Sequence, residues 1–129
     1  MTKAEFDIWL HRYGEAWETR DANKLLPLFA DNALYYETPF EAPMHGFEAI
    51  RAYWAELPTT QDHIHFHYRV VTVLPDDQAV AQWWASFIRL PSRTHVKIDG
   101  VMLCEFDQDG KCSVLREWWH RQEVVDGGK

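Results

Sequence analysis

The sequence predicts an α+β domain in which three N-terminal helices pack on a curved, mainly antiparallel sheet. In the first sixty residues, apolar side chains recur every three or four positions, which is the period of an amphipathic helix. From residue 63 onward the period becomes two, in long runs separated by turn-forming residues. Helices followed by a series of strands favour an α+β domain with its helices on one face of the sheet.

The first helix is predicted over residues 2–20. Thr2 and Glu5 have the spacing of a capping box. Apolar residues then follow at helical intervals: Phe6, Trp9, Leu10, Tyr13 and Trp17. The third predicted helix, over residues 47–57, has the same period, and we expect Pro58 to end it.

The second helix, predicted over residues 25–29, is expected to be short or bent. Proline is tolerated in a helix only within the first turn, so Pro27 must lie near the start. This placement makes Asn23 a better N-cap than Asp21. A short strand over residues 34–36 is predicted to follow the second helix.

Four long strands are predicted from residue 63 onward, arranged as an antiparallel meander. Turn-forming sequences separate them at residues 75–77, 91–93 and 107–110. Gly100 lies inside the third of these strands and predicts a β-bulge that helps the sheet to curve. We expect the segment after Glu123 to be frayed.

The composition limits the class of protein. A chain of 129 residues has the size of one domain, so we predict a single domain over residues 1–129. Seven Trp, seven Phe and five Tyr either fill a core of large residues or line an apolar pocket. The net charge of −7 argues against a nucleic-acid partner and favours a neutral or cationic small molecule.

The first residues and the two cysteines of the chain indicate where the protein is expected to be located. The first residues carry acidic side chains and no apolar core of a signal peptide, and no stretch approaches the ~20 apolar residues of a membrane span. Cys104 and Cys112 are predicted to be free, buried thiols in a reducing compartment. We therefore expect a cytoplasmic protein with no membrane partner.

Four pieces of sequence, in order, carry a family resemblance: Leu28-Phe29-Ala30-Asp31, Tyr35-Tyr36-Glu37-Thr38-Pro39, His45-Gly46-Phe47-Glu48-Ala49-Ile50 and Arg116-Glu117-Trp118-Trp119. Over nearly the whole chain, the sequence resembles the SnoaL-like branch of the NTF2-like superfamily. The resemblance implies a sheet curled into a cone with a pocket at its open end. This superfamily includes polyketide cyclases, ketosteroid isomerases, scytalone dehydratases and non-catalytic transport or interaction modules.

Glu117 is a candidate acid/base residue. On a strand it shares a face with Trp119, and a carboxyl group among aromatic rings acquires a raised pKa that suits proton transfer near neutral pH. The resemblance implies the same role, because SnoaL-type polyketide cyclases carry an acidic residue between Arg and Trp here, as in Arg116-Glu117-Trp118. The alternative is a solvated or interface residue paired with Arg121 or Lys97.

Three histidines alternate in the sequence His63-x-His65-x-His67 and would point to one side of a strand. No Cys, Asp or Glu has the spacing of a further zinc ligand, so no metal is predicted. The resemblance implies another role, because scytalone dehydratases and related dehydrochlorinases pair a His near the start of this strand with an Asp late in the first helix. The corresponding residues are His63 (or His65) and Glu18. The alternative is a solvated Glu18 paired with Arg20.

Tyr13 lies at the first-helix position where ketosteroid isomerases carry the Tyr that donates a hydrogen bond to the developing oxyanion. The resemblance therefore implies that its phenol polarises a substrate carbonyl. The isomerase base and second donor correspond to Thr38 and Met102, so that form of the reaction is not expected. The alternative for Tyr13 is core packing.

Together these residues predict a small cofactor-independent enzyme of isomerase, dehydratase or cyclase type that acts on an apolar carbonyl compound. In this hypothesis Glu117 and His63 exchange protons, and Tyr13 hydrogen-bonds the substrate oxygen. The residues expected to bind the substrate are Trp17, Glu18, Tyr36, Trp54, His65, Trp83, Met102 and Trp119. The alternative is a non-catalytic NTF2-like module that binds a small hydrophobic ligand or a protein partner.

A homodimer through the open face of the sheet is also expected. Trp84 and Ile88 are candidates for that face, and apolar side chains there are costly to leave in water. Many relatives in the resembled superfamily dimerise through this face.

Overall fold

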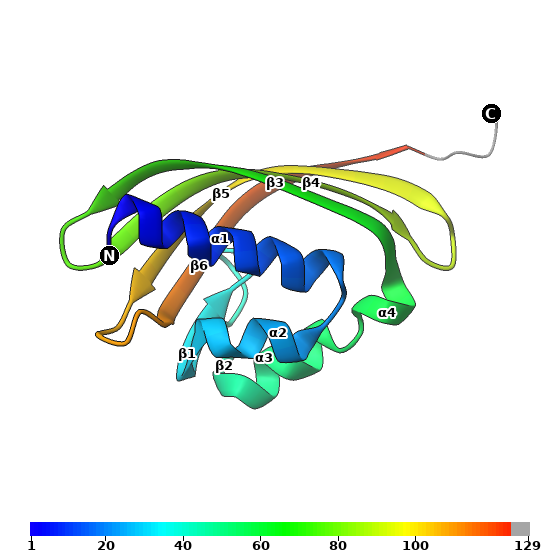
Figure 1. Ribbon diagram of the computed structural model, residues 1–129. Helices are drawn as coiled ribbons and strands as arrows, with labels where there is room; N and C mark the ends of the chain where they lie inside the picture. Colours follow the sequence, from blue (N-terminus) through cyan, green and yellow to red (C-terminus); the bar gives the residue numbers. More distant parts are fainter. Residues whose placement is uncertain (125–129) are drawn as a thin grey trace.

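The computed structural model describes residues 1–124 and shows a curved sheet that arches over the helices (Figure 1). The sheet has six strands in the order β2-β1-β6-β5-β4-β3. Their bounds are β1 (Phe29–Tyr36), β2 (Met44–His45), β3 (Gln61–Leu74), β4 (Gln78–Arg89), β5 (Thr94–Phe106) and β6 (Cys112–Val124). The last four strands form the predicted antiparallel meander, and β1 adds to β6 in parallel. The α+β class and the curved, mainly antiparallel sheet are confirmed.

Helix α1 (Lys3–Glu18) begins with the predicted capping box. The Thr2 hydroxyl accepts a hydrogen bond from the Glu5 backbone N–H at 3.1 Å, and the Glu5 carboxylate accepts one from the Thr2 N–H at 2.8 Å. These bonds satisfy two of the N–H groups that a helix start leaves unpaired. The apolar stripe of α1 is buried against the inner face of the sheet, so the helix brings Tyr13 into the interior.

The second predicted helix is divided into two short pieces, α2 (Ala22–Leu25) and the 3-10 turn η1 (Leu26–Leu28). It is short and bent, as predicted, but its cap is Asp21, whose carboxylate accepts from the Asn23 N–H at 2.9 Å. The prediction of Asn23 as cap was wrong because Pro27 lies in the first turn of η1. The α-helical turn before it, α2, therefore begins at Ala22, earlier than the position of Pro27 suggested.

The third predicted helix is also two elements, α3 (Gly46–Trp54) and α4 (Leu57–Thr60). Pro58 lies in the first turn of α4, so it starts a helix rather than ending one, as a first-turn proline can. The predicted block of three N-terminal helices is not confirmed, since β1 and β2 separate α1 and α2 from α3 and α4.

Gly100 is not at a bulge, because its pairing with Trp83 on β4 and Trp119 on β6 is regular. A Cβ atom there would lie 2.7 Å from the Trp118 carbonyl oxygen, 2.9 Å from the Trp119 Cβ and 3.0 Å from the Trp83 Cε2. Glycine is needed for this close approach of the Trp118 carbonyl, the Trp119 Cβ and the Trp83 indole. The register shifts occur elsewhere, for example in β3 between Asp62 and His65.

Aromatic rings from α1, β1, β3 and β4 pack between the helices and the sheet, so part of the aromatic content forms the core. Cys104 and Cys112 are buried and free, as predicted. The predicted frayed segment after Glu123 falls, except for Val124, outside the described residues. Within residues 1–124, no helix combines the length and apolar composition that crossing a membrane requires.

Candidate acid/base site

A cavity of about 160 Å³ opens between the inner face of the sheet and helices α1, α3 and α4. Its apolar wall includes Trp17, Trp54, Trp83 and Trp119, four of the residues that were expected from the sequence to bind the substrate. Seven polar side chains also line it: Tyr13, Tyr35, Glu37, Tyr53, Gln61, Glu117 and Arg121. Trp17, Trp54 and Trp83 therefore belong to the buried core and also line this cavity.

Glu117 lies at the inner end of the cavity and is only 5% exposed. Alternation along β6 puts it on the same face as Leu115, as the strand period predicted, and in the structure this face points inward. Its Oε2 accepts a hydrogen bond from the Tyr13 hydroxyl at 3.2 Å and from the Tyr35 hydroxyl at 3.3 Å. The predicted alternative pairing with Lys97 or Arg121 is not formed. Helix α1 and strand β1 thus hold the carboxyl group from two sides.

Burial raises the pKa of Glu117 to about 8, and the negative charge of Glu37 contributes to the rise. The hydrogen bonds from Tyr13 and Tyr35 act in the opposite direction, because they stabilise the carboxylate. Burial also raises the pKa of both phenols, and the charge of Glu117 adds to this effect. At neutral pH the site therefore holds a protonated carboxyl group and two neutral phenols.

The number of protons that this cluster needs also indicates that Glu117 is protonated. The Tyr13 and Tyr35 hydroxyls are 2.9 Å apart, so Tyr13, Tyr35 and Glu117 form a triangle of three oxygen contacts. Each contact needs one proton, and each phenol supplies only one. All three hydrogen bonds form together only when Glu117 supplies the third proton. When Glu117 ionises, the two phenols can both donate to the carboxylate.

Glu37 is a second carboxyl group lining the cavity, just after the end of β1. The indole N–H of Trp119 donates to the backbone carbonyl of Glu37 at 2.9 Å and anchors this segment to β6. Tyr53 of α3 lies at the same end, and its pKa is raised by burial and by the charge of Glu37. The site therefore contains two carboxyl groups, that of the buried Glu117 and that of the half-buried Glu37.

The aromatic wall is held by edge contacts and hydrogen bonds. Trp17 packs edge-on against Trp54 and Trp83, and its N–H donates to the Gln61 side-chain oxygen at 2.8 Å. The indole N–H groups of Trp54 and Trp83 have no acceptor among the described residues. Buried rings with few free rotamers keep the cavity open rather than collapsed.

His63 lies outside this cavity, so the structure does not bring it together with Glu117. Its side chain is 65% exposed, and its Nδ1 is 3.3 Å from the Asp62 carboxylate. The prediction assumed regular alternation of side chains along β3. His63 instead adopts the left-handed conformation with φ of 51°, and the pairing of β3 with β4 shifts register between Asp62 and His65. His63 therefore does not lie where regular alternation would place it. His65 follows on the open face of the sheet.

Glu18 also lies outside the cavity and pairs with neither His63 nor Arg20. Its carboxylate accepts a hydrogen bond from the Phe66 backbone N–H at 2.9 Å, which attaches the end of α1 to β3. Arg20 instead places its Nη1 3.9 Å from the Asp62 carboxylate. The expected pair of a histidine and a helical carboxylate is therefore absent among the described residues.

Tyr36 and Met102 are not in the cavity wall either. Tyr36 points to the other side of β1 from Tyr35, and the Arg116 guanidinium lies 4.2 Å from its ring centre. Met102 is fully buried opposite Glu117 in the sheet. Sequence reasoning missed Tyr35, Glu37 and Tyr53. The alternation of β1 contained the signal for Tyr35, since only one of two adjacent tyrosines on a strand can face inward.

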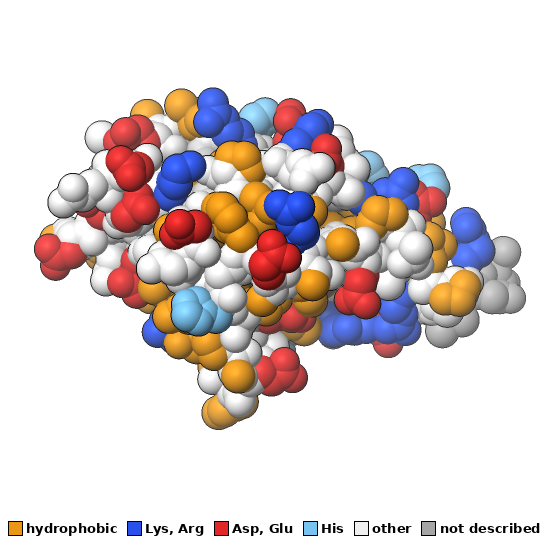
Figure 2. Space-filling model, turned by 90° about the horizontal axis from the view of Figure 1, so that it is seen from below, with side chains coloured by type: hydrophobic (Ala, Val, Ile, Leu, Met, Phe, Trp, Pro, Cys, Tyr) orange, Lys and Arg blue, Asp and Glu red, His pale blue; other side chains and the backbone are white. Residues whose placement is uncertain are grey.

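The helix-covered side of the molecule mixes acidic, basic and apolar side chains (Figure 2). Within residues 1–124, no three His, Cys, Asp or Glu side chains are arranged to hold a metal ion. The titratable groups that line the cavity are the carboxyl groups of Glu37 and Glu117, the phenols of Tyr13, Tyr35 and Tyr53, and the guanidinium of Arg121.

Comparison with known proteins places this geometry in context. A family model described as the SnoaL-like domain matches residues 10–114. No curated protein matches the chain significantly.

Solved structures of other proteins share the fold, and two of them are described by their similarity to this chain. SalBIII, described as an epoxide hydrolase/cyclase-like enzyme in pyran ring formation of the polyether salinomycin, superposes with a TM-score of 0.77 at 19% identity. The match covers 88% of this chain and 89% of SalBIII. A proposed isomerase from Bacillus subtilis gives a TM-score of 0.79 at 18% identity, over 93% of this chain and 90% of that one. At such identities the likeness shows the fold alone.

Proposed function

This chain belongs to the SnoaL-like domain family, and from that membership and the cavity geometry we propose a small-molecule enzyme that works by proton transfer. The reaction is an isomerisation, a dehydration or a cyclisation. The observation that carries the proposal is the buried carboxyl group of Glu117, held by Tyr13 and Tyr35 inside a cavity with aromatic walls. The names of the two structural neighbours, cyclase-like and isomerase, agree with this class.

In the proposed mechanism Glu117 is the general acid. A carboxyl group with a pKa of about 8 is protonated at neutral pH, so it can give a proton to a substrate oxygen. The carboxylate that remains accepts hydrogen bonds from Tyr13 and Tyr35, which lowers the cost of the transfer. Tyr13 therefore acts on the carboxyl group rather than directly on the substrate oxygen.

Glu37 is the general base in this proposal. It takes a proton from the substrate carbon or hydroxyl while Glu117 protonates the oxygen, so the substrate gains and loses one proton. Its half-buried position near Tyr53 allows it to exchange that proton with water. For a ketone, the two transfers together produce an enol, the intermediate shared by isomerisation and dehydration next to a carbonyl group.

The cavity also restricts the substrate. Its volume of about 160 Å³ is below the ~300–1,000 Å³ typical of sites for drug-sized ligands. Four tryptophans form most of its apolar wall. The charged groups in its lining are the carboxyl groups of Glu37 and Glu117 and the guanidinium of Arg121, so no excess of positive charge favours an anion. We therefore propose a small, apolar, uncharged compound with a carbonyl or similar oxygen group.

Hydrogen–deuterium exchange next to a carbonyl group tests this proposal without knowledge of the natural substrate. The protein is incubated in D₂O with a panel of small apolar ketones, and loss of the α-proton signal is followed by NMR. The wild-type chain is expected to accelerate exchange for at least one ketone, and Glu117→Gln is expected to slow it by at least ~100-fold. Glu37→Gln is expected to have a similar effect, whereas His63→Ala retains the rate.

A non-catalytic ligand-binding module is the second candidate. The triangle of Tyr13, Tyr35 and Glu117 is satisfied internally without a ligand, as a purely structural cluster would be. Ketones that shift the Trp resonances of the cavity wall without any accelerated exchange would support this candidate. A rate for Glu117→Gln equal to that of the wild type would contradict the enzymatic assignment.

A further inference from the structure

Two buried indole N–H groups have no hydrogen-bond partner among residues 1–124. They are the Nε1 groups of Trp54 and Trp83, and these are the buried side-chain polar atoms that the described part of the chain leaves unpaired. The two side chains are only 3% and 2% exposed. A buried donor that has lost water without gaining an acceptor destabilises a fold, so such groups are rare and need an explanation.

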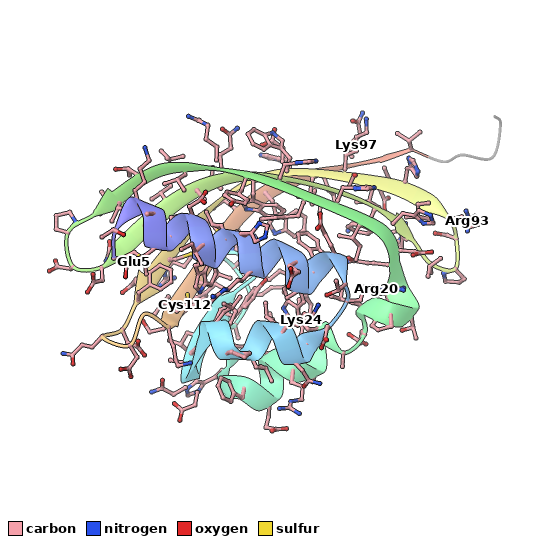
Figure 3. All side chains as sticks on the ribbon, in the orientation of Figure 1. Glu5, Arg20, Lys24, Arg93, Lys97 and Cys112 are labelled. Atoms are coloured by element: carbon pink, nitrogen blue, oxygen red, sulfur yellow. The ribbon has the colours of Figure 1, made fainter. Side chains whose placement is uncertain are left out.

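Both residues belong to the wall of the cavity that contains Glu117. Side chains of the helices and of the inner face of the sheet meet in this layer (Figure 3). Other indoles of the same layer each donate to an oxygen of the chain. These pairs are Trp9 with the Leu28 carbonyl at 3.0 Å, Trp17 with the Gln61 side chain at 2.8 Å and Trp119 with the Glu37 carbonyl at 2.9 Å. The two unpaired donors therefore lie where a ligand can supply the acceptor.

The Trp83 indole is held with its nitrogen edge over β5. Gly100 is opposite Trp83 in the sheet, and a Cβ there would lie 3.0 Å from the Trp83 Cε2, the ring carbon bonded to Nε1. The missing side chain at Gly100 thus leaves room for this edge of the ring. Glu117 on β6 is opposite Met102, the next inward-facing residue of β5 after Gly100. The N–H edge of Trp83 therefore extends from β4 toward the strand that carries Glu117.

Trp54 reaches the cavity from the helical layer, at the end of α3. Its ring packs edge-on against Tyr13 and Trp17, with centroid distances of 5.5 Å and 6.2 Å. Trp83 packs edge-on against the same Trp17 at 5.9 Å and stacks on Phe66 at 6.1 Å. Because these contacts hold both rings, neither indole has much freedom to turn toward another acceptor of the chain.

We propose that Trp54 and Trp83 donate their indole N–H groups to an oxygen of the substrate. This inference rests on the proposed function and adds a second point of recognition to it. Glu117 protonates one oxygen, and the indoles bind another. The substrate is then a small ketone with a second acceptor oxygen, as in a diketone or a hydroxyketone. An indole N–H is a neutral donor, which suits an uncharged oxygen.

The pairing of the other polar groups supports this assignment. The hydroxyls of Tyr13 and Tyr35 and the carboxyl group of Glu117 already bond to one another. An oxygen at Trp54 and Trp83 breaks no existing hydrogen bond of the chain and gives the unpaired donors an acceptor. A substrate without that oxygen leaves them unpaired, so the wall discriminates between the two compounds.

Two ketones with the same ring test this inference. 1,4-Cyclohexanedione has a second oxygen, and 4-methylcyclohexanone has a methyl group in its place. Binding is followed by NMR on the ¹⁵N-labelled chain, in which each indole N–H gives its own signal. An apolar wall without donors would favour 4-methylcyclohexanone, because the diketone is more strongly hydrated. The wild type is expected to bind the diketone at least as tightly, and only the diketone is expected to move the Trp54 and Trp83 indole protons downfield.

Trp54→Phe and Trp83→Phe each remove one N–H group and keep an aromatic ring. Each is expected to weaken binding of the diketone at least ~10-fold and binding of 4-methylcyclohexanone less than ~3-fold. The matched control is Trp17→Phe, which also shortens the wall but loses an N–H that Gln61 already accepts. This control is expected to weaken both ketones alike. Circular dichroism checks that each variant is folded, and if one is not, the wild-type comparison and its indole signals still decide.

A diketone that binds more weakly than 4-methylcyclohexanone, or that leaves both indole signals unmoved, would overturn the inference. Folded Trp54→Phe and Trp83→Phe variants that keep the wild-type ratio of the two dissociation constants would do the same. The measurement requires no turnover. Preference for the diketone without accelerated hydrogen–deuterium exchange would support the donor role and contradict the proposed enzyme, whereas exchange without the preference would contradict the donor role alone.

Discussion

The hydroxyl of Tyr35 lies 3.3 Å from the Oε2 of Glu117, although 82 residues separate the two in the chain. The contact follows from the parallel pairing of β1 with β6, in which Tyr35 is directly opposite Leu115. Leu115 and Glu117 share the inner face of β6, so the register that aligns the strands also aligns the phenol with the carboxyl group. The protonation of Glu117 therefore depends on the attachment of β1 to the sheet.

Replacing Tyr35 by Phe is expected to raise the pKa of Glu117 above that of the wild type. The phenol donates a hydrogen bond that favours the carboxylate, and its loss removes this stabilisation. A hydrogen bond to a charged group is worth about 1.5–3 kcal/mol, which corresponds to roughly one to two pKa units. NMR titration of the glutamate side chain measures the shift. The control is Tyr36→Phe, on the opposite side of β1, which is expected to leave this pKa unchanged.

The stability of the fold is expected to fall as pH rises from about 4.5 to about 8. Folded Glu117 keeps its proton up to pH about 8, whereas a glutamate in the unfolded chain loses it near its ordinary pKa of 4.5, so the folded chain binds more protons across this range. The full shift corresponds to roughly 5 kcal/mol at 1.36 kcal/mol per unit. Denaturant unfolding between pH 4 and 9 is compared for the wild type and Glu117→Gln, whose side chain cannot ionise. The difference between the two plots of unfolding free energy against pH isolates the contribution of Glu117 from that of other titrating groups. Parallel plots would show that the pKa of Glu117 is not raised in the folded chain.

Gly100→Ala is expected to destabilise the fold by about 1–3 kcal/mol, the usual cost of overpacking. The new methyl group would lie 2.7 Å from the Trp118 carbonyl oxygen and 2.9 Å from the Trp119 Cβ, and backbone cannot move aside cheaply. The midpoint of denaturant unfolding measures the effect. Val101→Ala, the exposed neighbour, serves as the control and is expected to cost less. Equal losses of unfolding free energy for the two variants would show that the atoms around Gly100 have room for a methyl group in solution.

Much of the fold could be predicted from local patterns. The capping box of Thr2 and Glu5, the apolar stripe of α1 and the three turns between long strands each depend on a few neighbouring residues. The helix bounds near Pro27 and Pro58 were harder to predict, because a proline can either end a helix or lie in the first turn of the next one. Only the packing of the surrounding segments decides between these outcomes.

The candidate site could be predicted only in part. Strand alternation grouped Glu117 with Leu115 and Trp119 on one face but left open whether that face lines the cavity. Helical spacing placed Tyr13 and Trp17 on the apolar stripe of α1. His63 was misplaced because a register shift in β3 changes the face on which a side chain lies, and no sequence pattern marks that shift. Glu37 was missed because it follows the end of β1, where the period of two no longer applies.

The most direct test of the account is the titration of Glu117 itself. The chain is labelled with ¹³C at the glutamate side-chain carboxyl carbon, and the resonance of Glu117 is assigned by its loss in Glu117→Gln. The account predicts that this resonance titrates with a midpoint near pH 8. A midpoint near pH 4.5 would show an ordinary, ionised carboxylate and would contradict the proposed general acid.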